Sequence, residues 1–203
     1  MSRNSTHWEN VYQTKGPQDV SWTQDVPETS LQLIRSFALP KDAAIIDIGG
    51  GDSKLVDYLL EEGYSNLSVL DISASALNKA KERLGEKAST VKWIVSDITA
   101  FVPEQKYAVW HDRAAFHFLT EEGHIHKYVQ LAKECVTGFL AIGTFSDNGP
   151  KKCSGLDIKQ YNEEGLKNTF ADGFTQLACT RTVHTTPFDT TQDFVFCSFK
   201  VNQ

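Results

Sequence analysis

Ala44-Ile-Ile-Asp-Ile-Gly-Gly-Gly-Asp-Ser53 is the stretch of sequence that decides the fold. Its first half is apolar and β-branched, which is typical of a buried strand, and its three glycines predict a tight turn into a helix. A second apolar run, Leu67-Ser-Val-Leu70, is closed by Asp71, twenty positions after Gly51. Glycines let a ligand approach the backbone closely, and an acid at this distance accepts hydrogen bonds from a ribose. The stretch therefore predicts a binding site for an adenosine-containing cofactor.

The rest of the chain alternates between strand and helix patterns. Strands are expected at 43–48, 67–72, 91–95, 107–111 and 138–144, and helices at 27–37, 53–62, 73–84, 121–135 and 162–170. Two final strands, at 173–184 and 192–201, have no helix between them and are expected to pair antiparallel. The pattern predicts an α/β fold: a doubly wound, seven-stranded, mostly parallel sheet with a terminal antiparallel strand and helices on both faces.

Length and charge narrow the class of protein. The 203 residues suffice for one well-buried domain, expected at 27–203, preceded by a segment, 1–26, that shows no hydrophobic period. The net charge of −6 gives no electrostatic reason to bind nucleic acid or an anionic membrane. The chain has neither an apolar run of about 18 residues nor the apolar region of a signal peptide. We expect a soluble cytoplasmic protein, and the oligomeric state stays open.

The cysteines show no metal-binding pattern. Cys135, Cys153, Cys179 and Cys197 are widely spaced, with no C-x-x-C pair. No metal site is expected, and reduced, mostly buried thiols are predicted.

The glycine turn discriminates between adenosine cofactors. A nicotinamide fingerprint, G-x-G-x-x-G, places a third glycine where this chain has Lys54. The turn reads instead as Asp47-x-Gly49-x-Gly51-x-Ser53, which resembles the Asp/Glu-x-Gly-x-Gly-x-Gly signature of class I S-adenosylmethionine-dependent methyltransferases, with serine in place of the last glycine. In that family, matching acids follow the second and third strands, and the final antiparallel pair is present.

The first residues resemble one subgroup of this family. The pattern His7-Trp8-Glu9-Asn10-x-Tyr12, followed by Trp22, is similar to the N-terminal cap of small bacterial methyltransferases of the thiopurine and tellurite-resistance type, and of some protein-lysine methyltransferases. The resemblance implies that residues 1–26 fold over S-adenosyl-L-methionine. Trp22 is expected beside its sulfonium, where an indole face gives about 0.5–2 kcal/mol, whereas Trp8 is expected only to pin the segment to the core.

The resemblance also implies a set of cofactor contacts. Asp71 matches the acid that holds the ribose hydroxyls, and Asp97, with Ile98 beside it, matches the acid that receives the adenine amino group. The expected cofactor-binding residues are Trp22, Asp47, Gly49, Gly50, Gly51, Ser53, Asp71, Ile72, Leu77, Asp97, Ile98 and His111.

Acceptor-site candidates follow the fourth and fifth strands, because sites of doubly wound sheets lie beyond the carboxyl ends of the strands. Asp112 and His117 are candidates for a proton acceptor, and Arg113 is a candidate for binding an anion. The alternative is that Asp112 and Arg113 form an ion pair that fixes the loop while His117 only packs. In the loop 146–158, Cys153 follows two lysines and is either a reactive thiolate that contacts the acceptor or a neutral structural thiol. Whether any general base is used stays open.

The sequence thus predicts an S-adenosylmethionine-dependent methyltransferase that acts on a small molecule; thiol, metalloid, carboxylate and amine acceptors stay open. Protein-lysine methylation is the alternative within the family. An NAD(P)-dependent oxidoreductase and a non-catalytic cofactor-binding module are the alternatives from other classes.

Overall fold

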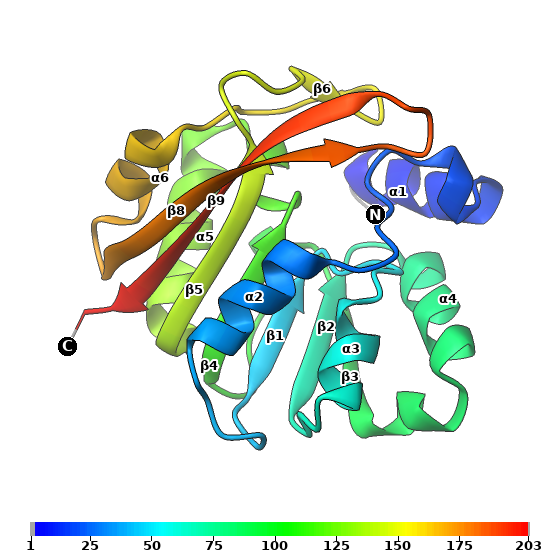
Figure 1. The fold of residues 1–203 in the computed structure, drawn as a ribbon, viewed down its shortest axis with the longest axis horizontal. Coiled ribbons are helices and arrows are strands. Elements are labelled where there is room, and N and C mark those ends of the chain that lie inside the picture. The colour runs from blue at the N-terminus through cyan, green and yellow to red at the C-terminus, as the bar shows by residue number, and fades with distance from the viewer. Residues whose placement is uncertain (1–2, 203) are drawn as a thin grey trace.

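A seven-stranded sheet forms the centre of the computed structural model, in the order β3-β2-β1-β4-β5-β9-β8 (Figure 1). Adjacent strands of the sheet are parallel, except that β9 runs antiparallel to both of its neighbours, β5 and β8. The strands are β1 (Ile45–Ile48), β2 (Leu67–Asp71), β3 (Val91–Val95), β4 (Tyr107–Arg113), β5 (Val136–Phe145), β8 (Phe174–Thr185) and β9 (Thr191–Val201). This confirms the predicted fold class.

Helices cover both faces of the sheet (Figure 1). They are α1 (Arg3–Thr14), α2 (Glu28–Ser36), α3 (Leu55–Glu61), α4 (Ala74–Leu84), α5 (Glu122–Cys135) and α6 (Glu163–Phe170). One buried cluster joins α2, α3 and α4 to the sheet through apolar residues such as Leu31, Leu59 and Leu77. A second joins α5 and α6 to the opposite face through Tyr128 and Phe170. Short 3-10 turns lie at Pro17–Asp19, Gly85–Thr90, Ile98–Ala100 and Phe116–Phe118.

The order of the strands determines where a ligand can bind. The chain reverses its direction of winding between β1 and β4, which are neighbours in the sheet, and Ile48 is paired with both Leu70 of β2 and Asp112 of β4. In such sheets the crevice opens beyond the carboxyl ends of the strands at this switch point. The glycine-rich turn after β1 lies there.

The structure describes residues 3–202. Residues 1, 2 and 203 lie outside the described part, and with them the outer ends of the expected units 1–26 and 27–203. Among the helices described, none combines the length and the apolar character needed to cross a membrane.

Helix α1 was not expected from the sequence. The helix is polar overall, so its hydrophobic period is weak, yet Val11 and Tyr12 are buried on its inner face. Its stability comes from tertiary contacts, since short helices of this kind are marginal alone. The carboxylate of Glu9 accepts hydrogen bonds from Ser73 Oγ (2.8 Å) and from both the hydroxyl and the backbone N–H of Ser75, at the first turn of α4.

The prediction of four reduced cysteines is wrong for one pair. Cys179 and Cys197 form a disulfide, because they are direct partners across the antiparallel pair β8–β9. A pairing of this kind depends on strand register and has no spacing signature in the sequence. Cys135 and Cys153 are free and buried. In the loop 146–158, the short strands β6 (Lys152–Cys153) and β7 (Leu156–Asp157) turn Cys153 inward.

Candidate functional site

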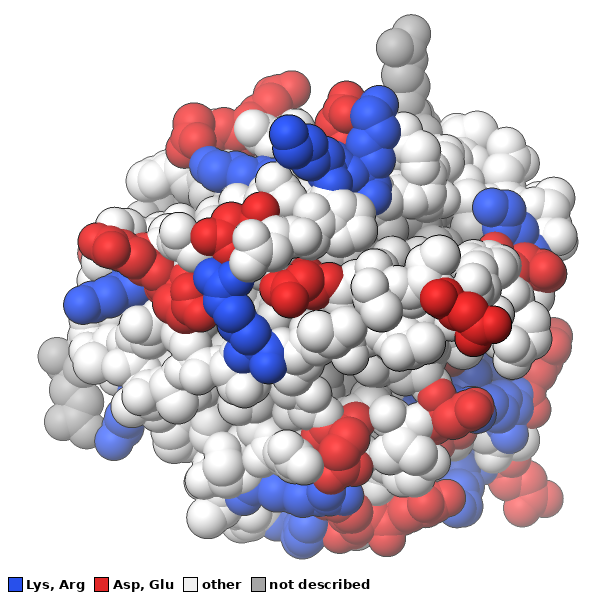
Figure 2. Space-filling model, turned by 45° about the horizontal axis from the view of Figure 1, so that its top comes forward, with Lys and Arg blue, Asp and Glu red and all other residues white. Residues whose placement is uncertain are grey.

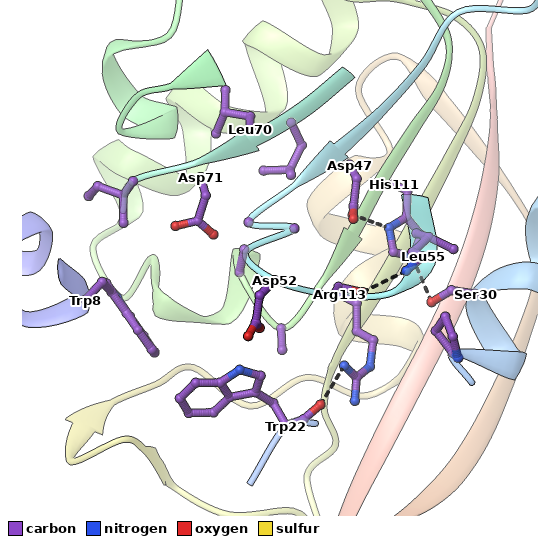
Figure 3. A pocket seen from close by; sticks show the side chains of 18 of the residues that line it. Trp8, Trp22, Ser30, Asp47, Asp52, Leu55, Leu70, Asp71, His111 and Arg113 are labelled. Atoms are coloured by element: carbon purple, nitrogen blue, oxygen red, sulfur yellow. Dashed lines mark hydrogen bonds and ion pairs between the residues drawn. The ribbon is translucent and has the colours of Figure 1, made fainter. Parts of the chain in front are cut away.

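A cavity of about 250 Å³ lies at the carboxyl ends of β1, β2 and β4, covered by α1 and the segment that follows it. The side chains of Asp47, Asp52 and Asp71 point toward it from one side and those of Arg113 and Trp22 from another (Figure 3). The predicted residues that line the cavity are Trp22, Asp47, Gly49, Gly50, Ser53, Asp71, Ile72, Asp97, Ile98, His111, Arg113 and Cys153.

The glycine turn leaves the backbone accessible because side chains are excluded there. Gly49 and Gly51 have φ values of 65° and 54°, a left-handed conformation that strains other residues. A Cβ atom on Gly51 would lie 2.5 Å from the hydroxyl of Tyr12 in α1. The turn therefore accepts only glycine where it meets the N-terminal helix, and Tyr12 covers Gly51 so that this residue itself does not line the cavity.

Two acids flank the turn on the side of β2 and β3. Asp71 is 6% exposed, and its Oδ1 accepts a hydrogen bond from Ser73 N (2.8 Å). Burial raises the pKa of Asp71 to about 7, although backbone N–H groups oppose the shift. Asp97 accepts hydrogen bonds from the N–H (2.9 Å) and hydroxyl (2.7 Å) of Thr99, which orient its carboxylate. Both acids line the same cavity although they come from different strands.

A buried hydrogen-bonded chain supports the opposite end of the turn. Asp47 Oδ1 lies 2.7 Å from His111 Nδ1, and His111 Nε2 lies 2.8 Å from Ser30 Oγ in α2 (Figure 3). All three side chains are buried and line the cavity. These two hydrogen bonds link β1, β4 and α2, and they fix the orientation of the Asp47 carboxylate.

Aromatic side chains form the wall below α1. Trp8 packs edge to face on Trp22 (ring centres 5.5 Å apart) and on Phe118 (5.1 Å), and Tyr12 lies 6.2 Å from Trp22. These four residues all line the cavity. Trp8 was expected only to pin the segment to the core; it does pack there, but it is also part of the cavity wall.

Arg113 and Cys153 line the cavity on the side of β5 and β9. The guanidinium of Arg113 lies over the ring of Phe194 (5.4 Å) and donates from Nη1 to the carbonyl oxygen of Trp22 (3.1 Å). Burial raises the pKa of the Cys153 thiol to about 12, while its neighbour Lys152 pairs with Asp157 on the surface. Burial therefore favours the neutral, structural thiol over the reactive thiolate at Cys153.

Asp112 and His117, the two candidate proton acceptors, do not reach the cavity. Asp112 is fully buried and accepts hydrogen bonds from the N–H groups of Ala115 (3.0 Å) and Phe116 (2.9 Å) and from the hydroxyl of Tyr128 (2.8 Å). It points away from its neighbour Arg113 because consecutive residues of a strand face opposite sides. The alternative prediction was an ion pair between Asp112 and Arg113. Both residues belong to the described part of the chain, and they form no such pair because their side chains face opposite sides of the strand.

His117 is also fully buried, and its Nδ1 accepts a hydrogen bond from Phe145 N (3.3 Å). Burial lowers its pKa to about 3, so the ring is neutral. Leu77, an expected cofactor contact, instead packs in the cluster beneath α3 and α4, because it lies on the inner face of α4. None of these three residues lines the cavity.

Residues outside the predicted set complete the cavity. Asp52 lines it, and burial raises the pKa of its carboxyl. Arg83 of α4 fixes the turn by donating to the carbonyl oxygens of Asp52 (2.8 Å) and Ser53 (2.9 Å). The sequence could have identified Asp52, because it is a polar residue inside the glycine turn. Arg83 and Ser30 belong to no recognisable sequence motif.

Comparisons with known proteins show what this architecture is similar to. Residues 45–138 match the model of a family described as a methyltransferase domain. This part of the chain is similar to a methyltransferase domain, and the fold is that of class I S-adenosylmethionine-dependent methyltransferases. This match supports the prediction of S-adenosyl-L-methionine as cofactor, and one solved structure with the same fold contains S-adenosylhomocysteine.

Similar proteins differ in what they methylate. The eEF1A lysine and N-terminal methyltransferase of Mus musculus is 26% identical over 121 residues, which are 59% of this chain and 17% of that protein. The chain thus spans less than a fifth of the length of this relative.

Two solved structures share the fold. A SAM-dependent methyltransferase from Anabaena variabilis (TM-score 0.76, 15% identity) covers 100% of this chain, with 96% of its own length matched. The 1,6-didemethyltoxoflavin-N1-methyltransferase of Burkholderia thailandensis, solved with its substrate and S-adenosylhomocysteine (TM-score 0.70, 15% identity), covers 98% of this chain, with 84% of its own length matched.

Proposed function

We propose that the chain transfers the methyl group of S-adenosyl-L-methionine to a small-molecule acceptor. The observation that carries this proposal is a single covered cavity with two unlike ends. One, the cofactor half, is formed by Asp47, the glycine turn, Asp71, Asp97 and Ile98. The other, the acceptor half, is formed by Trp22, Arg113 and Cys153.

The cofactor half fits an adenosyl group. The turn has glycine where a Cβ would meet neighbouring atoms, and Asp71 directs a buried carboxylate into the cavity (Figure 3). In the proposed complex Asp71 accepts hydrogen bonds from the ribose hydroxyls, Asp97 receives the adenine amino group and Ile72 and Ile98 contact the ring. Asp47, held by His111, faces the methionine end.

The residues of this chain would contribute alignment and exclusion of water. When bound, the cofactor supplies a methyl group on a sulfonium, which is a good leaving group. Holding the nucleophile in line with such a methyl group supplies much of the rate. Neither Asp112 nor His117 lies on the cavity, so neither removes a proton from the acceptor directly. The segment 1–26, of which residues 3–26 are described, is the proposed cap: Trp8, Tyr12 and Trp22 close the cavity from above.

Protein-lysine methylation is the second candidate, because the mouse relative acts on lysine and an N-terminus according to its name. A protein substrate needs room for an extended chain beside the methyl group. Here the aromatic wall and the Glu9 contacts to Ser73 and Ser75 hold α1 over the cavity, which favours a small acceptor.

Two measurements test the proposal. Calorimetry should show S-adenosylhomocysteine binding with micromolar-range affinity, and S-adenosylmethionine turnover over panels of small thiols, amines and carboxylates should exceed turnover over a lysine-peptide panel. A folded sample that binds neither cofactor form would refute the function. Binding without turnover on either panel would favour a non-catalytic module, and higher turnover on peptides would favour lysine methylation. Binding of NADH with an absorbance change on reaction would favour the oxidoreductase alternative.

A further inference from the structure

Arg113 differs from the other arginines whose side chains the structure describes. Arg181 donates from Nε (2.7 Å) and Nη2 (3.0 Å) to Glu163, and Arg83 donates from the same two atoms (2.9 and 2.8 Å) to Asp57. Arg35 directs the same edge at Glu62 (3.0 and 2.6 Å). This edge of a guanidinium matches the two oxygens of a carboxylate. In each of these three arginines it is occupied by a carboxylate of the chain.

In Arg113 the same edge has no partner. Its Nε and Nη2 are buried without a hydrogen bond, while Nη1 is fixed by the carbonyl oxygen of Trp22. Among the described side chains, no carboxylate lies within ion-pair distance of this guanidinium. Burial lowers the pKa of Arg113 to about 10, so the group remains charged at neutral pH. A buried charge with two unsatisfied donors is unfavourable unless a ligand supplies the missing acceptors.

Several charged side chains on the surface of this protein, unlike Arg113, have neighbours of opposite charge. On the face shown in Figure 2, positive and negative side chains are interspersed, in keeping with the exposed ion pairs of Lys54 with Asp25 and Lys133 with Asp172. The free edge of Arg113, in contrast, is enclosed by the protein beside the cavity and does not lie on the surface, where water would satisfy it.

We propose that the methyl acceptor carries a carboxylate and that the free Nε–Nη2 edge of Arg113 binds it. This inference rests on the function proposed above. The guanidinium lies over Phe194 of β9, whereas the glycine turn and Asp71 belong to β1 and β2, and Asp52 lies between Asp71 and Arg113 (Figure 3). The aromatic wall of Trp8, Trp22 and Phe118 beside it gives the apolar part of such an acceptor a surface to pack on.

The methionine end of the cofactor also carries a carboxylate, so the experiment separates the two sources. Calorimetry would compare S-adenosylhomocysteine with 5′-methylthioadenosine, which lacks that carboxylate, for the wild type, Arg113→Gln and Arg113→Lys. With S-adenosylhomocysteine bound, acetate, benzoate and indole-3-acetate would then be titrated against their amides. Arg35→Gln, which removes an exposed arginine of α2, is the matched control for loss of one positive charge.

We expect at least one carboxylate to bind the wild type about tenfold or more tightly than its amide. Arg113→Gln should abolish that preference, Arg113→Lys should retain part of it, and Arg35→Gln should retain all of it. The ratio of the affinities for the two nucleosides should stay unchanged in every variant. The inference is overturned if no carboxylate is preferred over its amide, or if Arg113→Gln weakens S-adenosylhomocysteine and not 5′-methylthioadenosine. Failure of the wild type to bind either nucleoside would instead refute the proposed function.

Discussion

The two halves of the cavity are built in different ways. The cofactor half takes its groups from the ends of β1, β2 and β3 and from the turn directly after β1, so its residues follow one another at regular intervals along the chain. In the acceptor half, Arg113 of β4 bonds to Trp22, 91 positions earlier, and packs on Phe194 of β9. The residues of the cofactor half can therefore be recognised from local sequence motifs, whereas those of the acceptor half are brought together only by folding.

The halves also differ in charge. The cofactor half brings Asp47, Asp52, Asp71 and Asp97 to one cavity, whereas the acceptor half presents the guanidinium of Arg113. An acidic surface suits hydroxyl and amino groups that donate hydrogen bonds, and a guanidinium suits an anion. We therefore expect one part of the cavity to bind groups that donate hydrogen bonds and the other part to bind a group that accepts them.

Removing the disulfide tests how the acceptor half is supported, and has the largest expected effect. Cys179 and Cys197 join β8 to β9 with a sequence separation of 18, and β9 also carries Phe194 and Phe196. The double variant Cys179→Ala/Cys197→Ala should lose about 3 kcal/mol of unfolding free energy. Urea unfolding with and without reductant measures this, and the affinity for S-adenosylhomocysteine should stay unchanged below the transition. A wild-type midpoint that is insensitive to reductant would contradict the prediction.

Gly51→Ala tests the contact between the cofactor half and its cap. The new Cβ would meet the Tyr12 hydroxyl, and relieving such overpacking costs about 1–3 kcal/mol, so affinity for S-adenosylhomocysteine should fall roughly 5- to 150-fold. Gly63→Ala is the matched control, since Gly63 also has a positive φ (86°) but open space around it. It should lower stability alone. Equal effects of both variants on affinity would mean that backbone strain, and not the cap, is responsible.

Asp71→Asn tests the charge of the cofactor half. The amide oxygen can still accept from Ser73 N, but the hydrogen bonds from the ribose to a charged group are weakened, which costs about 1–3 kcal/mol of binding free energy. Asp112→Asn is the matched control, because Asp112 is equally buried and also binds backbone N–H groups, but outside the cavity. It should lower stability and leave the calorimetric dissociation constant unchanged. An unaltered constant for Asp71→Asn would remove the ribose-binding role.

Much of the fold was predictable because its signals are local. The strand of Val91–Val95 was predicted with its observed bounds, and the antiparallel pair at the end of the chain follows from two apolar runs without a helix between them. Helix α1 and the disulfide were missed, because the first depends on contacts with α4 and the second on strand register.

Site prediction failed where the direction of a side chain mattered. The sequence places Asp112, Arg113 and His117 close together, and all three were candidates for the acceptor site. Strand β4 extends through Arg113, so the pleat sends Arg113 into the cavity and Asp112 into the core. His117 lies in a 3-10 turn whose inner side is already filled by Phe145. Position along the chain identifies the end of a strand, but not the face on which each residue lies.

The smallest expected effect is a dependence of cofactor binding on pH. The pKa of Asp71 is about 7 in the ligand-free protein because the carboxyl is buried. Ribose hydroxyls donate to the ionised form and lower this pKa in the complex, so binding releases a proton at pH values below about 7. Affinity for S-adenosylhomocysteine should therefore rise with pH up to about 7, by at most about tenfold per unit, and level off above it.

Calorimetry in buffers of different ionisation enthalpy counts the released protons, and Asp71→Asn should release fewer over the same range. The sign for folding is the opposite one. Because Asp71 binds a proton more readily in the folded chain than in the unfolded one, its contribution to stability without ligand falls as pH rises from about 4 to 7. A cofactor half that lost affinity as pH rose through this range would show that Asp71 binds its ligand as the neutral acid, and the division of the cavity into an anionic and a cationic half would not hold.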